Sequence, residues 1–286
     1  MEGNMKRLFP LFLSIALLLS AKEIIVKGSD TMVNLVQQLA ERYTAVHPDA
    51  TISVIGGGSG VGITSLIEKE VDIANSSREI KDKEIIAAKE KGVNIYKIPI
   101  GIDLLCVIVN EKNPVTKLTV SQLGKIYQGK IKNWQEVGGE KKPISLYGRQ
   151  PASGTYVFFR EIAVKGEYSP RMQQMAGTAQ IVDAVRNDIN GIGYVGLGYV
   201  RGQKGIKVLA IARDEKGPYL SPLNEEELKK YPLARPLYQI TNGKPKGEAK
   251  RFIEWELSEA GQKIVEEVGF LPLPEEMRKE VLTKLK

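Results

Sequence analysis

Cysteine and histidine are almost absent from this sequence of 286 residues, which contains one cysteine, Cys106, and one histidine, His47. One cysteine cannot form a disulfide within the chain, one Cys with one His leaves no Cys/His metal cluster, and a single His argues against a nucleophile–histidine triad. Cys106 lies in an apolar run, 103–110, so we expect it to be a small residue of the core. These scarcities argue against a disulfide scaffold, a Cys/His metal site and a triad hydrolase.

Apolar runs long enough to span a membrane are also lacking. Near the N-terminus the mostly apolar run 8–19 is shorter than the roughly 20 residues that a spanning helix needs. It follows Lys6 and Arg7, a pattern typical of a secretory signal peptide. We therefore expect a signal peptide over 1–21, cut after Ala21, and a periplasmic protein without a lipid anchor. The alternative is an uncleaved anchor at the membrane surface.

The composition is that of an ordinary globular protein, with 42% apolar and 26% charged residues. The 41 Lys and Arg exceed the 34 Asp and Glu by seven, so an anionic partner is allowed. The aromatic residues fall mainly in apolar periodic stretches and no basic–aromatic recognition motif appears, so we expect no nucleic-acid partner. The length gives room for two compact lobes, since domains usually hold roughly 100 to 200 residues.

Short β-rich runs alternate with amphipathic stretches after residue 22, which predicts an α/β fold with a mostly parallel sheet. The expected strands are 23–26, 51–55, 72–74, 95–109, 144–147, 193–195, 207–212 and 235–241. The expected helices are 32–47, 61–69, 81–91, 121–127, 179–188 and 246–267, with one more that starts near Thr155.

Two of these strands are expected to join two lobes. The apolar run 95–109 is long enough to leave one lobe and enter another, and 235–241 is expected to return. We therefore predict a lobe 1 of residues 22–102 plus 232–286 and a lobe 2 of residues 103–231. A cleft between two lobes is a common place for a small ligand to bind.

Four polar loops stand before expected helices or at the ends of expected strands. They are 28–32, 56–60, 75–78 and 149–155. Free N–H groups at a helix N-terminus attract anions, glycine lets the backbone approach a ligand, and Ser and Thr add hydroxyl donors. Any one of these loops is also explained as a helix cap, but four together favour an anion site. Two of them carry an arginine, Arg78 or Arg149, whose planar fork matches the oxygens of a phosphate-like anion.

Familiar nucleotide and hydrolase motifs are incomplete here. The run 57–62 has the spacing of a P-loop, but Ile63 stands where a lysine is needed. The run 191–196 matches Gly-x-Gly-x-x-Gly, yet it follows an expected helix, so we interpret it as a turn and a strand. Val61 stands where a nucleophile elbow around Ser59 needs its closing glycine.

At its polar loops the chain resembles the periplasmic phosphate-binding proteins that supply ABC phosphate importers. The matching segments are 28–32, 56–60, 71–74 leading into 76–78, 148–149 with 153–155, 191–194 and the tail 252–272. The resemblance covers nearly all of the chain after the expected signal peptide. It implies a two-lobe periplasmic binding protein fold of type 2, with two crossover strands and a ligand cleft between the lobes.

The resemblance also implies a function and a set of binding residues. We expect the protein to be a monomer that captures inorganic phosphate and delivers it to an ABC transporter permease, with no cofactor, no metal and no catalysis. The residues that it places on the anion are Ser29, Thr31, Met32, Ser59, Ser77, Arg78, Arg149, Ser153, Gly154 and Thr155.

One position departs from part of that family. Some members carry an aspartate where this chain has Ser77, and that carboxylate accepts the proton of hydrogen phosphate and repels fully ionised sulfate. Here we expect Asp30 or a serine oxygen to accept the proton, or discrimination to be weaker. Two alternatives stay open: a binder of another tetrahedral oxyanion, such as sulfate, molybdate or tungstate, and a phosphatase with Ser59 or Ser153 as nucleophile.

Overall fold

The computed structural model describes residues 23–286, so the expected signal peptide lies outside the described residues. The strands are β1 Ile24–Gly28, β2 Ile52–Ile55, β3 Ile73–Ser76, β4 Ile95–Asn110, β5 Lys117–Thr119, β6 Ser145–Arg149, β7 Gln173–Met175, β8 Gly191–Gly196, β9 Ile206–Val208, β10 Ala210–Ala212 and β11 Ala234–Asn242. The α-helices are α1 Val33–Val46, α2 Ser59–Ile67, α3 Asp82–Glu90, α4 Val120–Tyr127, α5 Gly154–Phe159, α6 Thr178–Asn187, α7 Gly247–Glu256, α8 Glu259–Val268 and α9 Glu275–Leu285. Short 3-10 or π turns are η1 Asp30–Met32, η2 Trp134–Val137, η3 Arg160–Val164, η4 Leu197–Tyr199 and η5 Leu228–Lys230.

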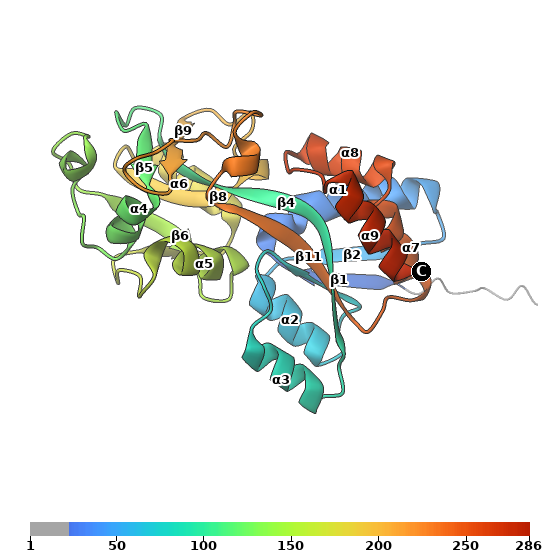
Figure 1. Ribbon diagram of the computed structural model, residues 1–286. Helices are drawn as coiled ribbons and strands as arrows, with labels where there is room; N and C mark the ends of the chain where they lie inside the picture. Colours follow the sequence, from blue (N-terminus) through green and yellow to red (C-terminus); the bar gives the residue numbers. More distant parts are fainter. Residues whose placement is uncertain (1–22) are drawn as a thin grey trace, which may run out of the picture.

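One curled sheet runs through both lobes, in the strand order β2-β1-β3-β11-β4-β8-β6-β7, with β9 also paired to β4. β11 pairs with β4 from Asn242 opposite Ile95 to Ala234 opposite Leu104, and β4 then continues to pair with β8. Figure 1 shows these two long strands passing side by side from the lobe with α1, α7 and α8 to the lobe with α4, α5 and α6. The two crossover strands predicted from the sequence are therefore present.

Each lobe has its own apolar core. In lobe 1, β1 and α1 pack with the C-terminal helices around Leu39, Tyr43 and Phe252, and a smaller cluster lies under α2 and α3. The core of lobe 2 is built from residues between Leu104 and Leu233. The core changes between Ile102 and Leu104 on β4 and between Leu233 and Leu237 at the start of β11. The division of the chain into lobes after residues 102 and 231 stays a prediction.

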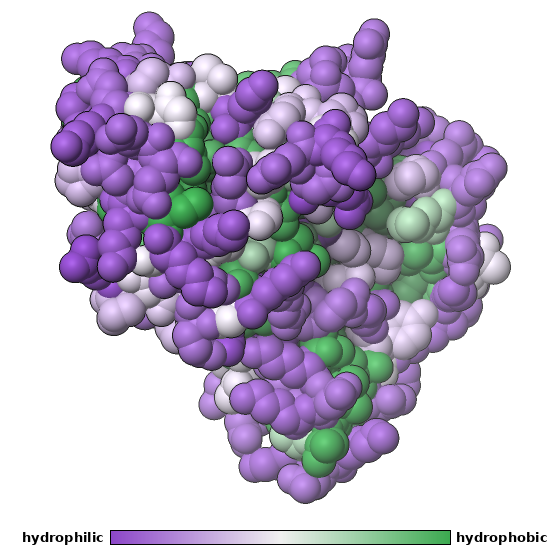
Figure 2. All heavy atoms as spheres, turned by 60° about the vertical axis from the view of Figure 1, so that its left-hand side comes forward, coloured by the Kyte–Doolittle hydropathy of each residue, from purple (hydrophilic) through white to green (hydrophobic). Residues whose placement is uncertain are grey.

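One face of the molecule is mostly hydrophilic. Figure 2 shows polar and charged residues over most of one face, with apolar residues in separate patches. No helix within residues 23–286 combines the length and the apolar character that crossing a membrane requires.

Three expectations about the elements are wrong. The sheet is mixed rather than mostly parallel, because the chain crosses between the lobes once in each direction and β11 and β4 pair antiparallel with their neighbours. The expected strand 207–212 is two strands, β9 on β4 and β10 on β5. The expected helix 246–267 is interrupted at Ser258. This serine caps the start of α8, because its Oγ accepts a hydrogen bond from Gly261 N at 3.2 Å. Helix α9 was not expected.

Two interpretations of small residues are confirmed. Cys106 is fully buried on β4, and burial raises the pKa of its thiol well above the ordinary value. The run 191–196 is strand β8, and a Cβ on Gly193 would lie 2.5 Å from a side-chain carbon of Ile181 on α6. This glycine therefore serves the close packing of a helix on a strand.

The carboxyl group of Glu256, at the end of α7, is fully buried. Its Oε1 accepts a hydrogen bond from Gln239 Nε2 of β11 at 3.1 Å, while its Oε2 accepts none from the described residues. Burial raises the pKa of Glu256 well above its ordinary value, although the hydrogen bond from Gln239 opposes this effect. The folded protein therefore favours the neutral form of this group.

We expect Glu256→Gln to stabilise the protein, and to do so more at high pH. The unfolded chain releases this proton above about pH 4.3 while the folded chain retains it, so Glu256 lowers the free energy of unfolding as the pH rises toward its raised folded pKa. A glutamine has no proton to release, and we expect a gain of at least about 1 kcal/mol at pH 8 and a smaller one near pH 4. Chemical denaturation measures both, with the exposed Glu266→Gln as control. A gain independent of pH would contradict this account.

Candidate functional site

Three loops of lobe 1 and one loop of lobe 2 meet between the lobes. Strands β2, β1 and β3 are parallel neighbours, so the loops at their carboxyl ends lie at one edge of the sheet. The fourth loop, 149–155, comes from the end of β6 in lobe 2. Thr31 Oγ1 lies 2.9 Å from Thr155 Oγ1, and Gly60 N donates to Ala152 O at 2.9 Å. The four polar loops of the sequence are therefore brought together in space.

Five buried hydroxyl groups lie at the centre of this meeting place, and we call them the hydroxyl cluster. They belong to Ser29, Thr31, Ser59, Ser77 and Thr155, and each residue exposes at most 2% of its surface. Ser29 Oγ donates to Ser77 Oγ at 2.8 Å, and Ser77 N donates to Ser59 Oγ at 3.1 Å. A hydroxyl both donates and accepts, so the cluster can turn its hydrogens toward a ligand.

Gly154 lets the loop of lobe 2 reach the hydroxyl cluster. A Cβ on this residue would lie 2.2 Å from Ser59 Oγ and 2.7 Å from Ser77 Oγ. Gly154 also begins α5, and the N-cap is Ser153, whose Oγ accepts from Thr155 N at 3.2 Å. The N-terminus of α5 therefore lies beside the cluster, and the Ser153 oxygen accepts hydrogen bonds within its own helix.

Arg149 is buried at the end of β6 and forms an ion pair with Asp30 across the lobes. Its guanidinium also donates to two backbone carbonyls and a threonine hydroxyl of lobe 2, at 2.7 to 3.2 Å. Asp30 Oδ1 in turn accepts from Gly57 N at 2.9 Å. The pair thereby ties the end of β6 to two loops of lobe 1.

Two expected ligand residues use donors in contacts outside the cluster. Arg78 is buried, but its guanidinium pairs with Glu84 of α3 through bonds of 2.7 and 2.9 Å. Met32 packs in the core of lobe 1, and its amide donates to Ser29 O at 3.0 Å. The Glu84 carboxylate of α3 therefore holds the two Nη atoms of Arg78, while its buried Nε has no partner among the described residues, and the Met32 amide is used by the turn η1. A role of Arg78 in binding stays a prediction.

Two residues that the sequence analysis did not single out lie beside the cluster. Arg235 of β11 and Asp103 of β4 form an ion pair of 2.7 Å, with side chains 1% and 0% exposed. Arg235 Nη2 also donates to Thr155 Oγ1 at 3.0 Å. Burial lowers the pKa of Arg235, and Asp103 opposes this effect. The available signal was a carboxylate within the apolar part of one crossover strand and an arginine in the other, since charges in buried strands are usually paired.

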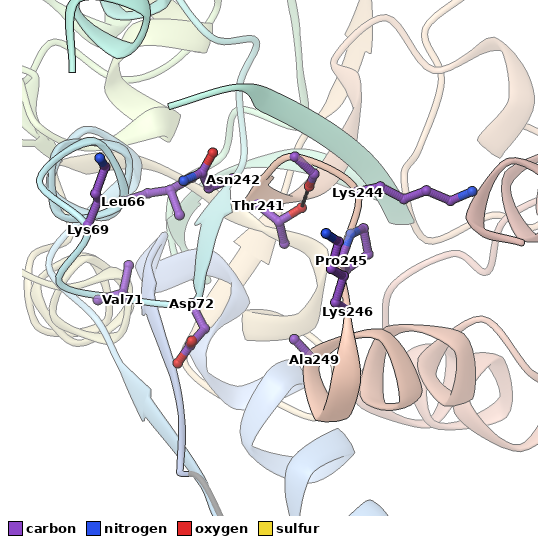
Figure 3. A pocket seen from close by; sticks show the side chains of 11 residues that line it. Leu66, Lys69, Val71, Asp72, Thr241, Asn242, Lys244, Pro245, Lys246 and Ala249 are labelled. Atoms are coloured by element: carbon purple, nitrogen blue, oxygen red, sulfur yellow. Dashed lines mark hydrogen bonds between the residues drawn. The ribbon is translucent and has the colours of Figure 1, made fainter. Parts of the chain in front are cut away.

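Broad hollows of the surface lie outside the cluster. One of about 590 Å³ lies between the end of α2, the start of β3 and the loop after β11, and Figure 3 shows Lys69, Asp72 and Lys246 around it. Another of about 600 Å³ is lined by α2, α3 and Arg78 of lobe 1 and by Pro151 and Ala152 of lobe 2. None of the five residues of the hydroxyl cluster lines either hollow. At the cluster the two lobes touch, through Thr31 and Thr155.

Sequence comparisons relate the chain to binding proteins. A sequence model described as a PBP superfamily domain matches residues 19–260. The chain is 32% identical to the phosphate-binding protein PstS of Pseudomonas aeruginosa, over 90% of this chain and 85% of that protein. It is 34% identical to the PstS of Staphylococcus aureus, over 91% of this chain and 81% of that protein. The chain belongs to the PstS family.

Solved structures agree with membership of the PstS family. The chain matches, with a TM-score of 0.78 and 29% identity, a Clostridium perfringens structure described as a phosphate ABC transporter substrate-binding protein with bound phosphate. The match covers 88% of this chain and 100% of that one. The fold is therefore that of a type 2 periplasmic binding protein, as the resemblance implied.

We expect Gly154→Ala to hold the two lobes apart at the hydroxyl cluster. The added Cβ would lie 2.2 Å from Ser59 Oγ, a distance that real side chains do not adopt, so the walls must separate by about 1 Å or more. Gly177→Ala is the matched control in lobe 2, because a Cβ there meets nothing within 4 Å. Crystal structures of both variants measure the separation between Ser59 and residue 154. An unchanged separation in the Gly154 variant would show that the contact between residue 154 and Ser59 does not limit how closely the lobes approach.

Proposed function

We propose that this PstS-family protein acts as a monomer in the periplasm, where it captures inorganic phosphate and delivers it to the permease of an ABC importer. The observation that carries this proposal is the convergence of buried donors from both lobes on the hydroxyl cluster beside Arg149. The relatives from Pseudomonas aeruginosa and Staphylococcus aureus are phosphate-binding proteins by name, and the similar structure from Clostridium perfringens holds phosphate. These similarities support the same ligand.

The hydroxyl cluster suits a tetrahedral anion that has lost its water. Such an anion needs a donor for nearly every oxygen lone pair, since an unpaired polar group costs free energy when buried. The hydroxyls of the cluster and the N-terminus of α5 at Gly154 supply neutral donors. On binding, the hydrogen bond between Thr31 and Thr155 would be exchanged for two bonds to the anion. The ligand would then join the two lobes.

Arg149 has one donor left for the anion. A guanidinium has five N–H groups, and four bonds of Arg149 go to Asp30, to Thr178 Oγ1 and to the carbonyls of Met175 and Ala176. The fifth N–H is on Nη1, which makes one bond to the described residues. We therefore propose one charge-assisted hydrogen bond from Arg149 Nη1 to the anion, with Asp30 fixing the guanidinium.

The acceptor for the proton of hydrogen phosphate stays open between Asp30 and a serine oxygen. Asp30 is close to the cluster, but its two oxygens already accept from Arg149 and from Gly57 N. Ser77 lies at the position where some members of the family carry an aspartate, and its Oγ accepts from Ser29 Oγ. A hydroxyl accepts as readily as it donates, so a serine acceptor would discriminate less against sulfate than a carboxylate does.

A hydrolytic function has less support. Ser59 Oγ contacts the Oγ and the N of Ser77, and Ser153 Oγ accepts from backbone N–H groups of α5. Neither hydroxyl is hydrogen-bonded to a carboxylate, a histidine or a lysine of residues 23–286, and such a base is what activates a serine nucleophile. We therefore propose a binding protein rather than an enzyme. A binder of another tetrahedral oxyanion remains the alternative.

Calorimetric titration of residues 22–286 with phosphate, sulfate and molybdate tests the proposal. We expect phosphate to bind with the highest affinity, because hydrogen phosphate can both donate to and accept from the cluster. Tighter binding of sulfate or molybdate than of phosphate would show that the other oxyanion is the ligand of this protein. Equal affinities for phosphate and sulfate would contradict phosphate specificity.

We expect Arg149→Ala to weaken phosphate binding by at least about a hundredfold, since removing one partner of a buried charge-assisted hydrogen bond costs roughly 2 to 5 kcal/mol. The variant loses its bond to the anion and also leaves Asp30 without its cation. Arg171→Ala, at an exposed position of the same lobe, is the control and should bind like the wild type. Titration calorimetry measures both. A loss of less than about tenfold would place the anion away from Arg149.

A further inference from the structure

We propose that Arg235 is a positioning residue of the ligand site, which fixes the hydroxyls of Thr31 and Thr155 as donors toward the bound anion. This inference rests on the phosphate-binding function proposed above and adds a residue to the machinery of that site. Arg235 belongs to crossover strand β11, so the inference also connects the hinge between the lobes with the ligand.

Arg235 reaches both walls of the site with one guanidinium. Its Nη2 lies 3.0 Å from Thr155 Oγ1 of lobe 2 and 3.4 Å from Thr31 Oγ1 of lobe 1. Its Nη1 donates to Ser77 O, also of lobe 1, at 3.1 Å. The ring of Phe158 on α5 lies against it, with 5.2 Å between Cζ and the ring centroid. The side chain therefore contacts three of the four loops or helices that surround the cluster.

These contacts determine which way the two threonine hydroxyls point. Nη2 has two N–H groups, and since one bonds to Asp103 Oδ2, the other is shared between Thr155 Oγ1 and the more distant Thr31 Oγ1. A hydroxyl has one hydrogen and two lone pairs, whereas a guanidinium only donates. Each oxygen that accepts from Arg235 keeps its own hydrogen for another acceptor. One of these hydrogens now forms the 2.9 Å bond between Thr31 and Thr155. When an anion replaces that bond, both hydrogens are available to it.

Asp103 holds the guanidinium in place and balances its charge. Asp103 Oδ2 accepts from Arg235 Nε at 3.0 Å and from Nη2 at 2.7 Å, and Oδ1 accepts from Leu197 N at 3.0 Å. The pair is almost fully buried and carries no net charge, so Arg235 is not an uncompensated counter-ion for the ligand. It acts through the hydroxyls, because a hydroxyl that accepts from a cation becomes a stronger donor.

A purely structural ion pair would stabilise the hinge and have no specific energetic coupling to Thr155. The double-mutant comparison therefore uses four proteins: the wild type, Thr155→Val, the pair Arg235→Gln/Asp103→Asn, and the combination of all three changes. The paired substitution removes the cation and the carboxylate together, since a lone buried carboxylate would destabilise the fold. Titration with inorganic phosphate gives the affinity of each protein, and thermal unfolding shows that each is folded.

We expect Thr155→Val to weaken phosphate binding at least about 30-fold in the wild-type background, as loss of a charge-assisted hydrogen bond does. In the background of the paired substitution we expect a loss of less than about fivefold, because the hydroxyl is no longer held as a donor. Equal losses in the two backgrounds would overturn the role of Arg235 and leave the phosphate-binding function in place. No phosphate binding by the wild type would overturn both.

Arg235→Lys provides a second test, which decides the matter if the paired substitution does not fold. A lysine keeps the charge beside Asp103 but lacks the planar fork that bonds to the carboxylate through Nε and Nη2, so it does not fix the hydroxyls in the same geometry. We expect phosphate binding to weaken at least about tenfold, and Thr155→Val to add less than about fivefold to that loss. Arg160→Lys, in an ion pair with the exposed Glu167, is the control. Wild-type affinity in Arg235→Lys would overturn the proposal.

Discussion

The cost of burying charge where the two lobes meet determines much of this structure. Two guanidinium groups, Arg149 and Arg235, are almost completely buried there, and each is paired with a carboxylate, Asp30 or Asp103. A buried charge without its partner would cost roughly 3 to 5 kcal/mol, so neither pair can be separated cheaply. Asp30 and Arg149 lie in different lobes, whereas Asp103 and Arg235 lie on the two crossover strands. Pairing therefore fixes both the contact between the lobes and the register of the hinge.

Because each arginine is paired with an aspartate, these four groups together carry no net charge near the hydroxyl cluster. A phosphate bound there would be held by hydrogen bonds from hydroxyls, from the N-terminus of α5 and from one N–H of Arg149, rather than by a surplus of cations. Hydrogen bonds weaken steeply once donor and acceptor move beyond about 3.5 Å. A small separation of the lobes would therefore release the ligand, which suits the proposed delivery to a permease.

The sequence predicted those features whose causes are local. Glycines and hydroxyl residues next to helices marked the four loops, and the apolar run 95–109 marked the crossover strand β4. Strand direction was not predictable in this way, because it depends on the chain returning to lobe 1 through β11. The pair of Asp103 and Arg235 joins positions 132 residues apart, so no local pattern could connect them. The break at Ser258 had a local signal, a serine followed by Glu259 in the first turn of α8, that was not used.

The two arginines of the polar loops show why residue type alone does not assign a role. Arg149 pairs with Asp30, which lies between Ser29 and Thr31 of the cluster, whereas Arg78 is held by Glu84, which also accepts from Lys81 N at 2.9 Å and so helps to begin α3. Arg78 directly follows Ser77, so its attachment to α3 restrains the backbone of that serine on one side. Arg235 Nη1 bonds to Ser77 O on the other side. An arginine whose guanidinium pairs outside the cluster therefore still contributes to where the Ser77 hydroxyl lies.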